Sequence, residues 1–208
     1  MQNTTLKAGE TDPWARSLAF QGVLRHGRRV RIRPISSGDK SRIATALLNM
    51  SARSRYLRFH EYRTGLTDAE LRYLTELDYR RHVAWGALAP DEPGRPGVGV
   101  ARFIRDPERP DAAEFAITVV DDWQGVGLGK LLLQTLLVSA AEYGIERLVA
   151  HVLEENTPAL RLFRHVGART VAQEDGSLVL EVPVSSAIRR PRASEARLSR
   201  VVVDASAG

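Results

Sequence analysis

The alternation of apolar and polar positions divides the central part of the chain into short strands and longer helical stretches. Strict alternation is typical of half-buried strands, and apolar residues three or four positions apart are typical of helices. These patterns predict strands at 30–33, 82–88, 98–104, 114–120, 147–153 and near Arg169 and Leu178. They predict helices at 39–50, after Thr67, after the glycine-spaced segment 121–130, and after Asn156. Along the chain, the predicted order is one strand, two helices, three strands, a helix, a strand, a helix and two strands. This order predicts a mixed α/β (α+β) fold.

Local signals place several ends of these elements. Thr67-Asp68-Ala69-Glu70 is a capping box, in which the first and last side chains accept backbone N–H groups at a helix start. Gly144 follows the long leucine-rich helix, where a residue with positive φ commonly ends a helix. Segments rich in Pro, Gly and Asp, at 90–97 and 106–111, join three consecutive strands and predict a meander of hairpins.

The same patterns predict one domain with a short segment on either side. Residues 1–26 show no clear periodicity, and residues 185–208 are rich in Arg, Ser and Ala. We therefore expect an N-terminal extension over 1–26, a folded domain over 27–184 and a basic, disordered tail over 185–208.

Composition excludes several classes of protein. The chain has 208 residues, 43% of them hydrophobic, and no cysteine, which rules out disulfides, thiolate zinc sites and an acyl-cysteine intermediate. No apolar run reaches the roughly 18 residues of a membrane span, and the polar start does not resemble a secretion signal. We therefore expect a cytoplasmic protein without a membrane partner. The histidines lack metal-site spacing, so we expect no metal.

The charge distribution argues against nucleic acid as a partner, although the isoelectric point is 9.9. Residues 1–33 hold seven basic and two acidic side chains, and residues 185–208 hold five and two. The remaining residues, 34–184, therefore carry a net charge of −3. The basic excess belongs to the two ends and does not form a stripe on the folded domain.

The segment Asp121 to Lys130 holds three glycines between an apolar strand and a leucine-rich helix. Glycines allow close backbone approach to a ligand, and the N–H groups of a starting helix favour an anion, so the segment predicts a pyrophosphate cradle. A dinucleotide fingerprint would need glycine at Lys130, and a Walker loop would need glycine at Gln124 and Ser or Thr at Leu131. Both templates fail. Gln124, Gly127 and Gly129 instead fit the pattern Gln/Arg-x-x-Gly-x-Gly/Ala.

That pattern resembles the acyl-coenzyme A loop of the GNAT N-acetyltransferase superfamily, and the predicted order of elements over about 27–184 is similar as well. The resemblance implies a central mixed, mostly antiparallel sheet flanked by helices in a single domain. It implies acetyl-coenzyme A as co-substrate and direct transfer to an amine acceptor. It further implies a cofactor-binding set of Ile117, Thr118, Val119, Gln124, Gly125, Val126, Gly127, Leu128, Gly129, Lys130 and Asn156. A plain helix N-cap is the alternative role for Asn156.

The acceptor amine must lose a proton before it attacks. A lysine amine with a pKa of ~10.4 is about three units from neutrality, which corresponds to roughly 4 to 5 kcal/mol. Glu114 begins the strand that the resemblance assigns to the cofactor, and is our candidate general base. Phe163 stands where many relatives carry tyrosine, so a tyrosine general acid at this position is excluded.

Further stretches are similar to the catalytic domain of bacterial Pat-type protein lysine acetyltransferases, namely 54–59, 71–84 and 113–116. This resemblance implies a protein lysine as acceptor. It also implies an acceptor cleft bordered by the first helices and their joining loop, with Arg55, Tyr56, Arg58 and Phe59. Many such proteins carry a second, regulatory domain; a chain of this length leaves no room for one, so we do not carry that regulation over.

Three other functions remain compatible with the sequence. The acceptor could be a small amine, such as a polyamine or an aminoglycoside, because an acidic domain attracts cations. The chain could also be a non-catalytic acyl-coenzyme A sensor, or a nucleic-acid binder that uses its basic ends. The sequence does not fix the acyl chain length or the oligomeric state.

Overall fold

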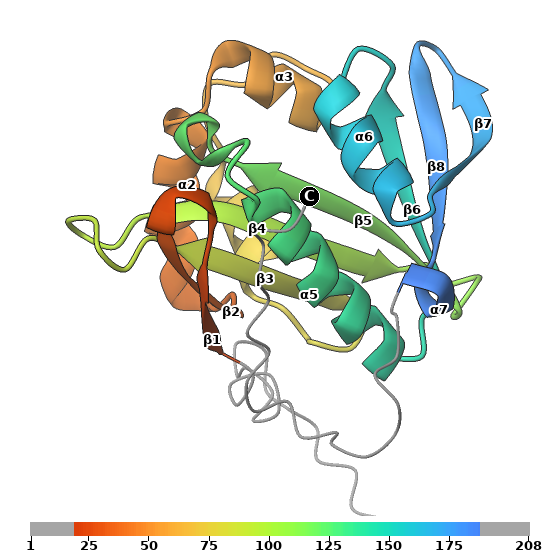
Figure 1. Cartoon of the computed structure of the whole chain (residues 1–208), viewed down its shortest axis with the longest axis horizontal. Coiled ribbons are helices and arrows are strands. Elements are labelled where there is room, and N and C mark those ends of the chain that lie inside the picture. The colour runs from red at the N-terminus through yellow and green to blue at the C-terminus, as the bar shows by residue number, and fades with distance from the viewer. Residues whose placement is uncertain (1–18, 188–208) are drawn as a thin grey trace, which may run out of the picture.

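In the computed structural model, which describes residues 19–187, the seven strands predicted from alternation join one further strand in an eight-stranded sheet (Figure 1). The strands are β1 (Phe20–Val23), β2 (Arg29–Pro34), β3 (His82–Leu88), β4 (Gly97–Arg105), β5 (Ala112–Val119), β6 (Arg147–Leu153), β7 (Arg169–Glu174) and β8 (Ser177–Pro183). The helices are α2 (Lys40–Leu48), α3 (Ala52–Phe59), α4 (Asp68–Thr75), α5 (Leu128–Glu142), α6 (Thr157–His165) and α7 (Val184–Ala187). Short 3-10 turns lie at Arg25–Gly27, Ser37–Asp39 and Asp121–Trp123.

The strand order is β1-β2-β3-β4-β5-β6-β8-β7, and the pairs are antiparallel except β5 with β6. The predicted meander is therefore confirmed as β3, β4 and β5. The mixed, mostly antiparallel sheet with helices on both faces confirms the predicted fold class. Gly144 has a φ of +69° directly after the C-cap of α5, as its glycine signal predicts.

The helix α5 covers one face of the sheet. Its leucines pack with the inward residues of the strands, and the indole Nε1 of Trp85 donates to Ser139 Oγ at 2.8 Å. At Gly99 the two layers approach so closely that a Cβ would lie 2.9 Å from Leu132 Cδ1 and 3.1 Å from the Thr118 carbonyl oxygen. Within the part of the chain that the structure describes, no helix is both long and apolar enough to cross a membrane.

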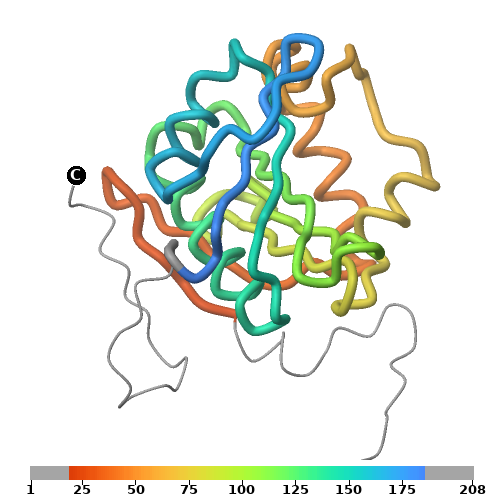
Figure 2. Tube along the Cα trace, turned by 90° about the vertical axis from the view of Figure 1, so that its right-hand side faces the viewer, coloured from red at the N-terminus to blue at the C-terminus, as the bar shows by residue number. Residues whose placement is uncertain are grey.

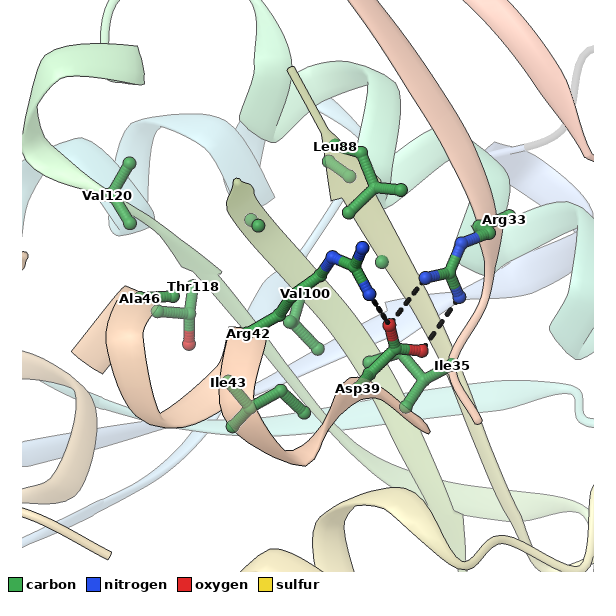
Figure 3. A pocket seen from close by; sticks show the side chains of 14 residues that line it. Arg33, Ile35, Asp39, Arg42, Ile43, Ala46, Leu88, Val100, Thr118 and Val120 are labelled. Carbon is green, nitrogen blue, oxygen red and sulfur yellow. Dashed lines mark hydrogen bonds and ion pairs between the residues drawn. The ribbon is translucent and has the colours of Figure 1, made fainter. Parts of the chain in front are cut away.

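The connection from α2 to β3 covers the opposite face, and Figure 2 shows it in orange to yellow at one side of the strands. Figure 3 shows how α2 is fixed there: the Asp39 carboxylate accepts from Arg33, at 2.7 Å from Nη1, and from Arg42 at 3.4 Å. Asp39 is buried, and burial alone would raise its pKa, but the hydrogen bonds from Arg33 and Ser36 outweigh burial and lower it. The charged side chains of Asp39, Arg33 and Arg42 lie beside a small cavity of about 40 Å³, which is also lined by Ile43 and Val100, among others.

Arg102 and His82 form a second buried polar pair on this face. Arg102 Nη1 lies 3.1 Å from His82 Nε2, and burial, followed by the charge of Arg102, lowers the pKa of His82 to about 4. His82 is thus neutral at pH 7, and its lone pair accepts the hydrogen bond, since arginine can only donate. Burial in turn lowers the pKa of Arg102 to about 10, which leaves the arginine charged.

The sequence patterns miss three elements, β1, α3 and α7. The strand β1 lies inside the range 1–26, so the sheet begins at Phe20 and not at residue 27. The helix α3 lies where a joining loop was expected; none of its residues is fully buried, so its apolar spacing is weak. Ser51 caps it by accepting from the Ser54 N–H at 3.1 Å. The tail expected to be disordered over 185–208 starts within α7, where residues 185–187 are helical; residues 188–208 lie outside the described range.

The close approach at Gly99 generates a stability prediction. We expect Gly99→Ala to lower the free energy of unfolding by about 1–3 kcal/mol, because the added methyl forces either α5 or β5 to shift. The measurement is urea unfolding followed by circular dichroism. Gly65→Ala is the control, since no atom lies within 4 Å of its Cβ, and we expect it to be neutral. Equal stability of the two variants contradicts the close packing of α5 on the sheet.

Candidate active site

The sheet opens between β5 and β6. These strands pair only from Ala112 with Arg147 to Glu114 with Val149, whereas β5 continues to pair with β4 as far as Val119. Beyond Glu114 the two strands diverge (Figure 1), so the outer edge of β5 has no strand partner there. An unpaired strand edge is a template for an extended ligand.

The direction of single backbone groups follows from the pairing with β4. The N–H of Val120 donates to the Val98 carbonyl oxygen on the β4 side, at 3.1 Å. Because successive residues of a strand direct their backbone groups to opposite edges, Ile117 and Val119 direct theirs into the opening. Thr118, lying between them, directs its backbone to β4 and reaches the cleft with its side chain.

A cleft of about 460 Å³ occupies the opening. It brings together most of the cofactor-binding residues predicted from sequence: Ile117, Thr118, Val119, Gln124, Gly125, Gly127, Gly129, Lys130 and Asn156. Val126 and Leu128 do not line it, because their side chains are buried in the core, at 9% and 0% exposure. The buried side chains of these two residues pack the glycine loop against the core.

The glycine loop has the backbone shape that a phosphate cradle requires. Gly125 and Gly127 have φ values of +74° and +97°, in the region that favours glycine. A Cβ on Gly129 would lie 3.3 Å from Leu162 Cδ2, which explains the third glycine. The 15-residue helix α5 begins directly after Gly127, so its first N–H groups, together with Lys130, would favour an anion at this end of the cleft. The residues present therefore fit the diphosphate of coenzyme A.

A polar network ties the loop to β5 and to α3. Gln124 Nε2 donates to the Val119 carbonyl oxygen at 3.1 Å. The carboxylate of Asp121 accepts from the Ser51 N–H at 2.9 Å, from the Ser51 hydroxyl at 2.8 Å and from the Ser54 hydroxyl at 2.7 Å. Partial burial alone would raise the pKa of Asp121, but these hydrogen bonds outweigh it and lower the pKa. Asp121 thereby fixes the N-terminus of α3 beside the loop.

The far wall of the cleft comes from α6. Asn156 is its N-cap, with Oδ1 accepting from the Ala159 N–H at 3.3 Å, and it also lines the cleft. Asn156 therefore caps α6 and also lies beside the cleft, where the resemblance placed it. Phe163 is buried and packs edge-to-face on Phe115, with ring centroids 4.8 Å apart, so the position of the missing tyrosine is an apolar wall.

Glu114 lies at the apex of the opening, in the last residue pair that joins β5 to β6. It is exposed, and by strand alternation its side chain lies on the same face of the sheet as those of Ala116 and Thr118. Among the described residues, none forms a hydrogen bond or ion pair with its carboxylate. Its negative charge acts on Arg58, where it partly offsets the lowering of the pKa by burial. Glu114 is not itself among the residues that line the cleft, but Ala116 and Thr118 on the same face of β5 are.

Arg58 is the one residue of the four predicted at the acceptor side that lines the cleft. Its Nε donates to Thr118 Oγ1 at 3.1 Å; burial lowers its pKa, and attraction to Glu114 partly offsets that effect. Phe59 lies 5.0 Å from Arg58 Cζ, Tyr56 stacks on Tyr62, and Arg55 Nε is buried without a partner. These three residues do not line the cleft.

The structure adds lining residues that the sequence did not indicate: Arg25, Met50, Ser54, Leu57, Phe115, Ala116, Ala150, His151, Val152, Pro158, Ala159, Leu162 and Phe163. Most are apolar strand or helix positions whose pattern signals core. His151 had a usable signal in the sequence, because it is a polar residue between the apolar Ala150 and Val152 in the strand predicted at 147–153. Among the described residues, no three His, Asp, Glu or Cys side chains gather where they could hold a metal ion.

A sheet that opens beside a glycine loop is the arrangement that the resemblance to the GNAT class implied. The chain matches the Acetyltransferase (GNAT) family over residues 44–168 and belongs to that family. It is therefore an acyltransferase, as its resemblance implied.

Two similar proteins carry the name Pat. The chain is 36% identical over 165 residues to "Acetyltransferase Pat" of Mycolicibacterium smegmatis, an alignment that covers 77% of this chain and 47% of that protein. This chain thus spans about half the length of that relative. It superposes on the GNAT domain of S. lividans PAT with a TM-score of 0.75 and 28% identity, covering 84% of this chain and 99% of that one.

A more distant structure shares the fold. The acetyltransferase yncA of Salmonella typhimurium, solved with acetyl-coenzyme A, is 20% identical, with a TM-score of 0.57 over 74% of this chain and 94% of that one. At this identity the likeness concerns the fold alone.

The Asp121 network generates a prediction with a pH dependence. A lowered folded-state pKa means that the charged carboxylate stabilises the fold above the unfolded value of ~3.9, and that this stabilisation is lost as pH falls through the folded value. We expect Asp121→Asn to lower the free energy of unfolding by about 1–2 kcal/mol at pH 7, with the difference narrowing below about pH 4.

Urea unfolding at pH 7, 5 and 3 checks this expectation. The matched control is Asp122→Asn, an exposed neighbour whose side chain makes no hydrogen bond to the described residues, and we expect its effect to stay within about 0.5 kcal/mol. A penalty at Asp121 that does not change between pH 7 and 3 rules out the charged network as its source.

Proposed function

We propose that this protein transfers the acetyl group of acetyl-coenzyme A directly to an amine, most specifically to the side chain of a protein lysine. The observation that carries the proposal is the exposed Glu114 carboxylate at the apex of an opening whose other end is a glycine cradle. A donor laid along β5 from the cradle would bring its thioester toward this carboxylate. The family membership supports this donor.

The donor would be held by backbone groups more than by side chains. The N–H groups of Gly125 to Lys130 suit its diphosphate, and the edge of β5 at Ile117 and Val119 suits the amides of the pantetheine arm. The Val119 N–H points into the opening, so it is our candidate to stabilise the thioester oxygen as negative charge develops there.

Glu114 would accept the proton of the attacking amine. A general base must be ionised and within reach of the proton it removes, and Glu114 is exposed beside the positive charge of Arg58. Arg58 is itself fixed by Thr118 Oγ1 on the strand that would bind the donor. Arg58 therefore links the base and the donor strand.

The leaving thiolate would need no side-chain acid. Phe163 offers no proton and forms an apolar wall with Phe115. An alkyl thiol with a pKa near ~8.5 leaves tolerably well at neutral pH. Water can complete the protonation.

Two observations favour a protein lysine over a small amine as acceptor. Glu114 lies at the exposed rim, where the long side chain of a lysine on a protein surface can reach it. The chain is also 36% identical to a protein named Pat and superposes on the GNAT domain of PAT, the class that the sequence motifs resemble.

The assignment of Glu114 generates a prediction. We expect Glu114→Gln to fold and to bind acetyl-coenzyme A with unchanged affinity, while kcat falls about 10²-fold or more because the base is lost. Steady-state kinetics and calorimetric binding measure the two effects separately. The control is Glu174→Gln, which neutralises an exposed glutamate on β7, and should leave kcat unchanged. A kcat/KM near that of the wild type overturns the role of Glu114.

The acceptor class generates a separate prediction. With acetyl-coenzyme A fixed, we expect kcat/KM for lysine-containing peptides to exceed that for spermidine or an aminoglycoside by about tenfold or more, because the rim is open. Thiol release from each acceptor measures the rates. A reversed order favours a small-amine enzyme, and donor binding with no turnover on any acceptor favours a sensor.

A further inference from the structure

Arg58 brings a positive charge into the cleft from α3, outside the glycine loop. Its Nε donates to Thr118 Oγ1 at 3.1 Å, and its Cζ lies 5.0 Å from the centroid of the Phe59 ring. Among the described residues, no oxygen accepts a hydrogen bond from its two terminal nitrogens, and no carboxylate forms an ion pair with it. The end of the guanidinium is therefore available to a ligand in the cleft.

The charges around Arg58 indicate where its guanidinium lies along β5. Burial lowers the pKa of Arg58, and attraction to Glu114 partly offsets that effect. Burial first, and then the charge of Arg58, lowers the pKa of Arg102, whose backbone pairs with Ala116 on β5. Glu114, Ala116 and Thr118 share one face of that strand. The guanidinium therefore lies over this face, hydrogen-bonded at Thr118 and within the field of Glu114.

A buried cation in this place is unfavourable unless a ligand brings a negative charge. Desolvation disfavours the charged form of Arg58, and the Thr118 hydroxyl that accepts its hydrogen bond is neutral. A neutral acetyl group does not need a guanidinium, and the ammonium of a lysine acceptor is repelled by one. The charge of Arg58 therefore suits a carboxylate that arrives with a substrate, to which a guanidinium can donate two parallel hydrogen bonds.

Two observations favour the acyl chain of the donor as the source of that carboxylate. Arg58 is hydrogen-bonded to β5, the strand whose free edge would hold the donor. Of the side chains near it in the sequence that line the cleft, Met50 and Leu57 are apolar and suit methylene groups. Glu114, on the same face, remains for the ammonium of the acceptor. Arg58 and Glu114 thus match the two opposite charges of an acidic acyl chain and a lysine.

We propose that the cleft also takes coenzyme A thioesters of short dicarboxylic acids, such as succinyl-coenzyme A, and that Arg58 binds the free carboxylate of the acyl chain. The inference rests on the proposed function, because it uses the same amine acceptor and the same base. The lone pair of the amine attacks the thioester carbon, the C–N bond forms, the C–S bond breaks, and Glu114 takes the proton of the amine. The products are the N-succinyl amine and coenzyme A, whose thiolate takes a proton from water.

The test compares succinyl-coenzyme A with butyryl-coenzyme A, a donor of similar length without the carboxylate, and runs acetyl-coenzyme A in parallel. One lysine peptide is the acceptor, and mass spectrometry identifies the acyl group that it receives. The proteins are the full-length wild type, Arg58→Gln, Arg58→Lys and Arg53→Gln. Arg53 is the control, since it is an exposed arginine of the same helix that does not line the cleft.

The readout is the ratio of kcat/KM for succinyl-coenzyme A to that for butyryl-coenzyme A within each protein, so a general loss of activity in a variant cancels. Calorimetry gives the same ratio for donor binding without an acceptor. Thermal unfolding of each variant confirms that it folds; the wild-type ratio and Arg58→Lys test the proposal if Arg58→Gln does not fold.

We expect the wild type to favour succinyl- over butyryl-coenzyme A by about tenfold or more, and Arg58→Gln to remove that preference, because the acyl carboxylate then lacks its charged partner. Arg58→Lys should keep part of the preference, since the charge remains and the planar fork is lost. Arg53→Gln should match the wild type.

Two results would overturn the inference. A wild type that does not favour succinyl-coenzyme A shows that the cleft has no carboxylate site, and a preference that persists unchanged in Arg58→Gln and Arg58→Lys assigns the carboxylate to another residue. In both cases the wild type still transfers acetyl groups, and the proposed function stands. Absence of turnover with all three donors would instead defeat the proposed function itself.

Discussion

The brevity of the parallel pairing between β5 and β6 is the constraint on which the site depends. Only three residue pairs join the strands, ending at Glu114 with Val149. Everything beyond that pair follows from it: the edge of β5 loses its partner, a cleft opens, and the backbone groups of Ile117 and Val119 are left directed into it. The same pair fixes Glu114 at the apex, so the geometry that creates the donor slot also locates the candidate base.

The cleft is assembled from segments far apart in the sequence. Its lining residues come from the hairpin at Arg25, the helix α3 with Arg58, the strand β5, the glycine loop and the helix α6. Asp121 is central to this assembly because it belongs to the loop region but accepts hydrogen bonds from both Ser51 and Ser54. A displacement of the start of α3 would therefore also shift the loop, because the Asp121 carboxylate is hydrogen-bonded to Ser51 and Ser54.

The parts of this site that local chemistry determines could be predicted from the sequence. The loop was predictable because Gly125 and Gly127 adopt φ values that few other residues tolerate, and that requirement is visible in the spacing alone. The meander and the end of α5 were predictable for the same reason, from turn residues and Gly144. The assignments of individual residues to donor, base and acceptor remain predictions.

The parts that depend on packing across the sheet could not be predicted. The helix α3 buries none of its residues fully, so no periodicity marks it, and β1 has only four residues. Arg58 was expected to meet the acceptor, yet its hydrogen bond to Thr118 Oγ1 depends on how α3 lies over β5, and one-dimensional spacing does not contain that information. Arg25 was assigned to an extension because its neighbours lack a long alternating pattern.

The edge-to-face contact of Phe115 with Phe163 has a mechanical consequence. It spans the gap directly behind the place where the backbone ladder stops. Since no backbone hydrogen bonds join the two strands beyond that line, the packing of the two rings helps to set their separation, and side-chain volume at these positions sets how wide the slot stands.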